Sequence, residues 1–102
     1  MSLSPEEQVA RAANARSLLE NPLLAETLQQ MKDEVIEQWK KSPAKDEKGR
    51  EKLWLTHALV EKLEGTLRLT VEQGKVAQQT LLQRAAAAAR DLAQRTGVRR
   101  SR

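Results

Sequence analysis

The chain has 102 residues, a formal net charge of +4, no cysteine, and only two aromatic residues, both tryptophan. The lack of cysteine excludes disulfides and thiolate chemistry, and few glycines and prolines among many Ala, Leu, Gln, Glu, Lys and Arg residues are typical of long helices or coiled coils. With so little bulky apolar material, such a chain usually needs self-association or a partner to bury enough surface.

Membrane insertion and secretion are not expected. No apolar stretch approaches the roughly 18 residues that a membrane-spanning helix needs. The first residues, MSLSPEEQVA, lack the basic start and apolar run of a signal peptide. We therefore expect an intracellular protein without a membrane partner.

An N-terminal helix is predicted within residues 1–20. Ser4 precedes Pro5 and is followed three residues later by Glu7, which is the pattern of a capping box with proline in the first turn. The apolar side of this helix is weak. We therefore expect it to dock on another element rather than to nucleate the fold.

A second helix is predicted to begin at Asn21 and Pro22 and to end before Pro43. Its apolar residues recur every three or four positions and form one stripe: Leu24, Leu28, Met31, Val35 and Trp39. Residues 21–73 are predicted to form a helical hairpin, in which this helix pairs with the start of the next.

The third predicted helix begins near residue 47, with Ser42 or Asp46 as its cap, and ends before Gly97, which favours a stop. Its apolar and small residues follow an unbroken heptad seam: Leu53, Thr56, Val60, Leu63, Leu67, Thr70, Gly74, Ala77 and Leu81. After one extra four-residue step the seam continues at Ala85, Ala88 and Leu92.

This third helix would be on the order of 70 Å long, whereas the second could cover only about 30 Å of it. The rest of the seam is predicted to be exposed, folded back at Gly74 or buried between subunits. We favour burial between copies, with residues 74–102 forming an extended helix and basic tail. Gly74 is either a tolerated small residue or a point of close helix approach or of a bend, and Leu59 and Leu69, off the seam, would face the first helix or another subunit.

Few residues could carry catalysis or hold a metal. His57 is the only histidine, and with Glu61 and Glu64 it forms a loose cluster that lacks the further His or Cys ligands of a specific metal site. The sequence offers no nucleophile–base pair, glycine-rich phosphate loop or enclosed carboxylate pair. We therefore predict no enzymatic activity, metal or cofactor, and a structural role for His57.

The two tryptophans flank the predicted turn. In an antiparallel hairpin, Trp39 and Trp54 would both lie near its closed end. They would either form a small core that sets the register of the two helices or present an exposed anchor for a partner, since tryptophan often carries interface energy.

The charge is divided unevenly along the chain. Residues 1–74 hold 11 basic and 13 acidic residues, a net charge of −2, whereas residues 75–102 hold 7 basic and 1 acidic, a net charge of +6. Arginine, which suits bidentate phosphate contacts, supplies most of this charge: Arg84, Arg90, Arg95, Arg99, Arg100 and Arg102. The tail has no aromatic residue for base stacking, so it would contact phosphates without recognising sequence. An acidic protein surface, or no partner at all, is the alternative.

A long stretch of the chain resembles small, poorly characterised helical proteins of tailed bacteriophages and prophages. The resemblance lies in the pattern L-x-N-P-L … W-x-x-S-P-A-K-D-x-x-G-R-E-x-L-W … E-x-G-K. It occupies Leu19, Asn21, Pro22, Leu23, Trp39, Ser42, Pro43, Ala44, Lys45, Asp46, Gly49, Arg50, Glu51, Leu53, Trp54, Glu72, Gly74 and Lys75. It implies a viral setting, in the cytoplasm of a bacterial host or in the virion, and no catalytic residues. The basic tail lies outside it.

The sequence therefore predicts an all-α, oligomeric protein: a helical hairpin, an N-terminal helix and a long C-terminal helix with a heptad-like seam. We expect a non-enzymatic role in virion assembly or DNA packaging, with the arginine-rich end on DNA or an acidic virion surface. One alternative is a scaffolding or chaperone-like protein that binds a capsid or portal protein without DNA. The other is a small inhibitor that docks a helix.

Overall fold

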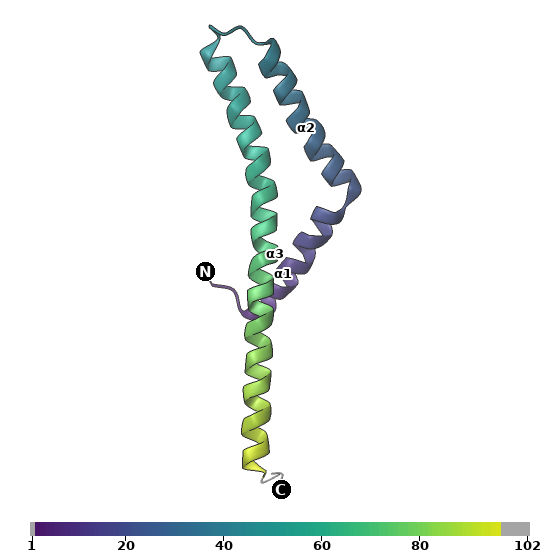
Figure 1. Ribbon diagram of the computed structural model, residues 1–102, viewed down its shortest axis with the longest axis vertical. Coiled ribbons are helices and arrows are strands. Elements are labelled where there is room, and N and C mark those ends of the chain that lie inside the picture. The colour runs from purple at the N-terminus through teal and green to yellow at the C-terminus, as the bar shows by residue number, and fades with distance from the viewer. Residues whose placement is uncertain (1, 97–102) are drawn as a thin grey trace.

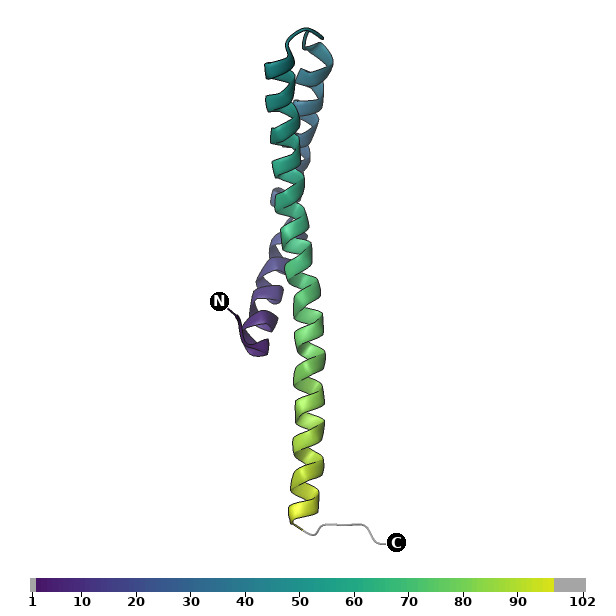
Figure 2. The same ribbon diagram turned by 90° about the vertical axis from the view of Figure 1, so that its left-hand side faces the viewer.

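The computed structural model describes residues 2–96 and contains three helices: α1 (Pro5–Glu20), α2 (Pro22–Lys41) and α3 (Glu47–Arg95). The molecule measures 80 × 27 × 24 Å, and α3 runs along its length (Figure 1, Figure 2). α1 and α2 follow one another along one side of α3, with an elbow between them at Asn21. The prediction of an all-α chain with a long C-terminal helix is confirmed.

The helix starts follow the capping patterns in the sequence. The Glu7 amide donates to Ser4 Oγ at 3.1 Å and the Ser4 amide donates to Glu7 Oε1 at 2.9 Å, which completes the capping box of α1. The Leu24 amide donates to Asn21 Oδ1 at 3.0 Å and begins α2. Asp46, and not Ser42, is the cap of α3. Each cap satisfies an amide that the helix itself leaves unpaired.

The N-terminal half of α3 pairs with α2 as an antiparallel hairpin. Leu28 and Val35 of α2 and Val60 of α3 are buried between the two helices. Beside this small core, Lys32 Nζ donates to Glu64 Oε1 at 2.9 Å, and both side chains are largely shielded from solvent. The apolar stripe of α2 thus meets the first half of the seam, as the spacing predicted.

The middle of α3 is covered by α1, through small residues. Ala12 and Ala15 of α1 and Gly74 and Ala77 of α3 are all buried. A methyl group built on Gly74 would overlap the methyl group of Ala12. Gly74 is therefore a point of close helix approach, and α3 continues through it without a break. Small residues let two helix backbones come close enough to pack without large side chains.

This arrangement changes the expectation for the seam beyond the reach of α2. The sequence predicts that the seam from Gly74 onward is buried between subunits. In the structure α1 covers this part of α3 as far as Leu81, which is half-buried. Residues 82–96 are all exposed. The part of α3 that projects without a packed neighbour in the chain therefore begins after Leu81 and not at residue 74.

Candidate functional site

Three regions of the molecule are candidates for interaction: the closed end of the hairpin, the projecting end of α3, and an exposed face of α3 between them.

At the closed end, Arg50 holds the turn together. Its Nη1 donates to Ser42 Oγ at 2.9 Å and to the Ser42 carbonyl at 3.2 Å, and its guanidinium carbon lies 4.0 Å from the ring centroid of Trp39. Ser42 Oγ in turn donates to the Trp39 carbonyl at 2.7 Å.

The start of α3 completes this turn. The Gly49 amide donates to Asp46 Oδ1 at 3.0 Å, and a side chain on Gly49 would overlap the Asp46 carboxylate. The W-x-x-S-P-A-K-D-x-x-G-R pattern of the sequence is thereby explained as turn chemistry. Tryptophan, serine, aspartate, glycine and arginine each have a structural task in closing the hairpin.

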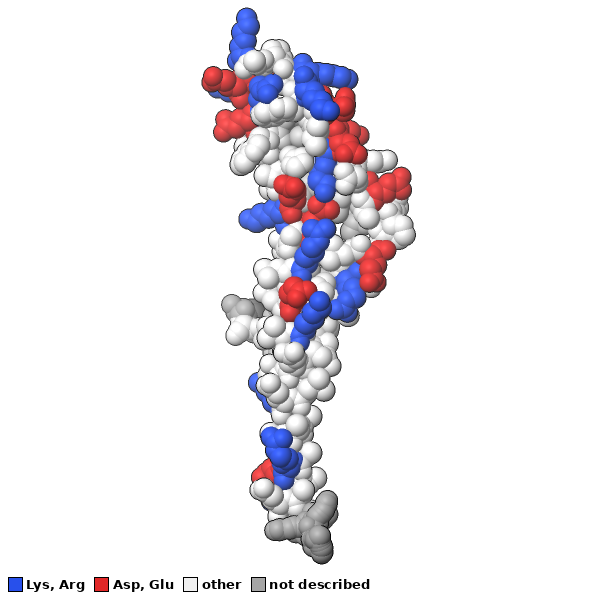
Figure 3. Space-filling model, in the orientation of Figure 1, with Lys and Arg blue, Asp and Glu red and all other residues white. Residues whose placement is uncertain are grey.

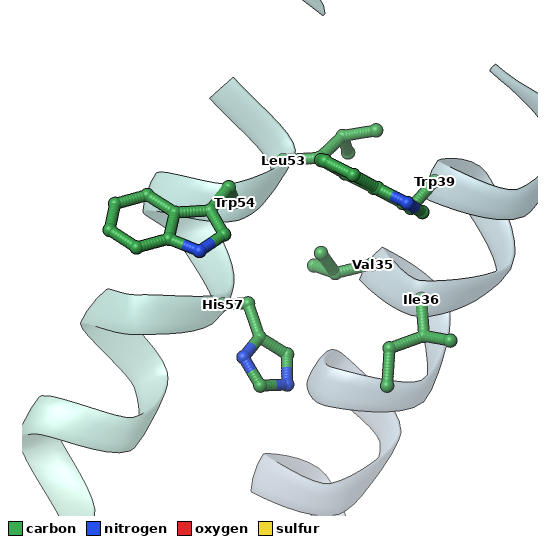
Figure 4. Close-up of a pocket in the computed structure, with 6 residues that line it drawn as sticks. All are labelled: Val35, Ile36, Trp39, Leu53, Trp54 and His57. Atoms are coloured by element: carbon green, nitrogen blue, oxygen red, sulfur yellow. The ribbon is translucent and has the colours of Figure 1, made fainter. Parts of the chain in front are cut away.

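Next to this turn lies an apolar hollow with a volume of about 240 Å³ (Figure 4). α2 and α3 contribute three residues each to its lining: Val35, Ile36, Trp39, Leu53, Trp54 and His57. Trp39 extends from α2 toward Leu53, whereas the ring of Trp54 lies apart from it on α3. The side chain of Trp39 thus belongs to the hairpin end, and Trp54, which is 61% exposed, is available to a partner.

The predicted histidine–carboxylate cluster is not brought together. His57 Nδ1 lies 3.5 Å from Glu61 Oε1, but Glu64 pairs with Lys32 instead. Within residues 2–96, no group of three or more His, Cys, Asp or Glu side chains could hold a metal ion. No helix in that range is long and apolar enough to cross a membrane.

The predicted seam residues are divided between two kinds of surroundings. Val60, Gly74 and Ala77 are buried, and Leu53, Leu67 and Leu81 are half-buried, all against the chain's own helices. Leu63 is exposed. The seam up to Leu81 is therefore used mainly within one chain, whereas its continuation at Ala85, Ala88 and Leu92 stays exposed.

The projecting end of α3 presents arginines on a surface with few other charges (Figure 3). Arg84, Arg90 and Arg95 are all exposed, and Arg95 Nη2 lies 3.2 Å from Asp91 Oδ2. Between Val76 and Ala89, Arg84 is the only charged residue. The remaining predicted arginines, Arg99, Arg100 and Arg102, lie outside the described residues, as does Gly97.

Sequence reasoning missed a second basic region, at the hairpin turn. Residues 40–52 hold six basic residues (Lys40, Lys41, Lys45, Lys48, Arg50 and Lys52) and three acidic ones (Asp46, Glu47 and Glu51). Figure 3 shows basic side chains, with acidic ones among them, at this end of the molecule. Counting charges in short windows would have found this region. The total for residues 1–74 hides it, because that total is −2. The 80 Å rod therefore carries positive charge at both ends.

Sequence reasoning also left undecided where the leucines outside the seam would point. Leu59 and Leu69 are both exposed, as are Leu55 and Val76, although Leu69 and Val76 share the lining of a hollow with Gln8 of α1. Comparison of the chain with protein-family models, with curated proteins and with solved structures finds no match.

Proposed function

We propose that this chain is a non-enzymatic, self-associating assembly protein whose arginine-rich C-terminal end contacts duplex DNA without recognising its sequence. The observation that carries the proposal is the projecting end of α3. Its arginines extend beyond the part of α3 that α1 covers, on a segment that the rest of the chain does not need for packing. Such a segment can engage a polyanion without disturbing the fold.

Self-association is supported by the apolar surface that the chain leaves uncovered. Large apolar side chains are exposed on all three helices, among them Leu18, Leu23, Met31, Leu59 and Val76. Exposed apolar area of this kind marks interaction surfaces in soluble proteins. Association would also place several weak cationic ends on one particle, and their combined avidity can exceed that of one end by orders of magnitude.

The resemblance to small helical phage proteins gives this proposal its setting. An assembly protein with cationic ends suits virion assembly or DNA packaging, in which a long polyanion is brought to a protein shell. The expected location is the cytoplasm of a bacterial host or the virion.

A second candidate function is favoured by Trp54. An exposed tryptophan beside an apolar hollow fits a scaffolding or chaperone-like protein that docks a capsid or portal protein and never meets DNA. In that case the basic end of α3 binds an acidic protein surface. The small docking inhibitor of the third hypothesis would use the same tryptophan as a monomer.

Binding to random-sequence duplex DNA across a salt series tests the first function. Each phosphate contact contributes about 0.9 to the slope of log affinity against log salt. Arg84→Gln with Arg90→Gln should lower that slope, whereas the matched pair Arg11→Gln with Arg16→Gln, also exposed arginines, should not. Truncation after residue 82 should abolish binding. Absence of binding by the full chain at low salt would refute DNA contact and favour the scaffolding protein, and a monomer at all concentrations by light scattering would favour the inhibitor.

A further inference from the structure

One face of α3 is mainly apolar and is left uncovered by both other helices, although Gln8 of α1 borders it. Leu55, Leu59, Leu69 and Val76 are exposed on it, and Leu59 is 67% exposed. These residues belong to a second heptad pattern with alternating steps of four and three, so they form one stripe along the helix. We call this set the outer stripe, and all of its members are exposed: Leu55, Leu59, Lys62, Thr66, Leu69, Gln73 and Val76.

The outer stripe contains a shallow hollow whose lining has the spacing that accepts a side chain of another helix. A hollow of about 310 Å³ is lined by Leu69, Glu72, Gln73 and Val76, with Gln8 of α1 closing one edge. The four α3 residues stand at positions i, i+3, i+4 and i+7. This is the set of four that accepts one knob in knobs-into-holes packing.

Four members of the outer stripe, Leu55, Lys62, Leu69 and Val76, are spaced symmetrically about one point, whereas Leu59, Thr66 and Gln73 are not. Leu55 and Val76 are equally far from the midpoint between Gly65 and Thr66, and so are Lys62 and Leu69. If a second copy of α3 is laid antiparallel with its centre here, Leu55 of each copy falls opposite Val76 of the other. Leu59 of each copy then falls opposite Glu72 and Gln73 of the other, which is the middle of the hollow.

Gly65 gives the same centre independently. Glycine is among the least favourable residues inside a helix, and a methyl group added to Gly65 would meet nothing within 4 Å. Gly74 has a reason within the chain, which is its contact with Ala12, but Gly65 has none. In the antiparallel register Gly65, which flanks the outer stripe, lies beside Gly65 of the second copy, where the absence of side chains allows the two backbones to approach.

We propose that two copies of this chain pair antiparallel through the outer stripes of α3, with the two-fold axis beside Gly65 and Thr66. This inference rests on the self-association in the proposed function and names its surface. The one charge within the stripe, Lys62, falls opposite Leu69 of the other copy and one helical turn from its Glu72. The ammonium group thus lies near a charge of opposite sign, and within the stripe the pairing places no like charges opposite each other.

The size of the contact fits a modest dimer. From Leu55 to Val76 the stripe is about 32 Å long, and a helix is about 10 Å wide. The flat footprint is therefore about 300 Å² on each copy, or about 600 Å² in total before the side-chain corrugation is counted, which is smaller than a standard specific interface and fits a weak, transient contact. We accordingly expect dissociation constants in the micromolar range, roughly 1–100 μM.

The antiparallel register also brings the two basic ends of the rod from different copies side by side. Arg84 of one copy falls opposite Glu47 of the other, at the start of its α3. Arg90 and Arg95 extend past that point, toward the hairpin turn of the second copy, where Lys45 and Lys48 lie. Each end of the dimer thus gathers the basic turn of one copy and the arginine-rich end of the other.

Single cysteines test the register, because the chain has no cysteine of its own. With a short bismaleimide, Thr66→Cys should cross-link to itself. Leu55→Cys should not, since its two copies would lie about 32 Å apart, but a mixture of Leu55→Cys and Val76→Cys chains should cross-link. Efficient self-linking of Leu55→Cys would instead mean a parallel pair and would overturn the proposal.

Charge substitution tests the face. Leu59→Glu with Leu69→Glu should raise the dissociation constant by at least about tenfold in sedimentation equilibrium, since carboxylates would be buried in the contact. Leu23→Glu, an exposed leucine on α2, is the control and should leave it unchanged. Circular dichroism should show the helices intact in all variants, because each leucine is exposed in the single chain.

Gly65→Gln distinguishes an effect on dimerisation from an effect on folding. It should preserve or increase helicity while weakening the dimer, because only the contact with a second copy needs the glycine. If the double variant Leu59→Glu with Leu69→Glu stays dimeric and truncation after residue 82 yields a monomer, self-association stands and this face is wrong. If the unaltered chain is monomeric at every concentration, both the proposed function and this inference fail.

Discussion

Gly74 of α3 lies directly against Ala12 of α1, so closely that a methyl group on the glycine would overlap the alanine methyl. Gly74→Ala should therefore lower the free energy of unfolding by about 1–2 kcal/mol, because the cost of overpacking exceeds the gain of up to ~1 kcal/mol in helix propensity. Urea unfolding followed by circular dichroism measures the change. Ala12→Gly in the same chain makes room for the new methyl and should recover part of the loss. An additive double-mutant cycle would contradict this contact.

Arg50 should not be replaceable by lysine. Arg50→Lys keeps the charge but loses the planar stack on Trp39 and the paired hydrogen bonds to Ser42. We expect a loss of about 1–2 kcal/mol of stability, measured by the fluorescence of Trp39 in a Trp54→Phe background. Lys52→Arg, an exposed basic residue near the same turn, should have no effect. Equal stability of the two variants would mean that the turn needs only positive charge.

Breaking the ion pair between Lys32 and Glu64 should lower stability, because it leaves one shielded charge without a partner. The side chains are only 19% and 15% exposed, so Lys32→Met should cost about 1–3 kcal/mol by leaving a shielded carboxylate without a partner. Adding Glu64→Leu should recover most of that cost. The exposed pair Lys75–Glu72 is the control, and Lys75→Met should change stability by less than about 0.5 kcal/mol. Thermal unfolding of these variants beside the unaltered chain decides between the outcomes.

The start of α1 should weaken in acid. The hydrogen bond that the Ser4 amide donates to the Glu7 carboxylate, and secondly the Ser4 side chain, lower the pKa of Glu7 below its ordinary value of 4.5. Because the folded pKa is lowered, the stabilisation is present above the unfolded pKa and is lost as pH falls through the folded one. Amide hydrogen exchange at the first turn of α1 should therefore speed up in acid relative to α3.

Glu7→Gln should remove this pH dependence, whereas Glu6→Gln, in the same turn, should keep it. A titration of the Glu7 carboxyl carbon by NMR gives the pKa directly, and Ser4→Ala should raise it. A midpoint at the ordinary value in the unaltered chain would mean that the capping box does not persist in solution.

Local sequence signals predicted the helices well. Ser4, Asn21 and Asp46 act as caps because their short polar side chains reach amides that the helix leaves free. The stripe of α2 and the first half of the seam met as expected, because spacing alone determines which residues share a helix face. These features depend on residues a few positions apart.

The placement of α1 could not be predicted in the same way. Its contact with α3 uses alanines and a glycine, which carry almost no hydrophobic signal, and its specificity comes from how closely two backbones can approach. For the same reason the exposure of Trp54 was left open, since burial depends on which side of α3 the other helices occupy. The outer stripe became visible only once α1 and α2 were known to leave that side free.

Because α3 is uninterrupted, it fixes the spacing between the two ends of the molecule. One helix from Glu47 to Arg95 sets both the distance and the angular phase between the hairpin turn and the C-terminal arginines. Seven residues inserted after residue 82 would lengthen this spacing by about 10 Å and nearly preserve the phase, whereas two would add only about 3 Å but turn the arginines to the opposite side. Whatever binds the two ends is therefore held at a defined separation and orientation, which insertions of different length would change independently.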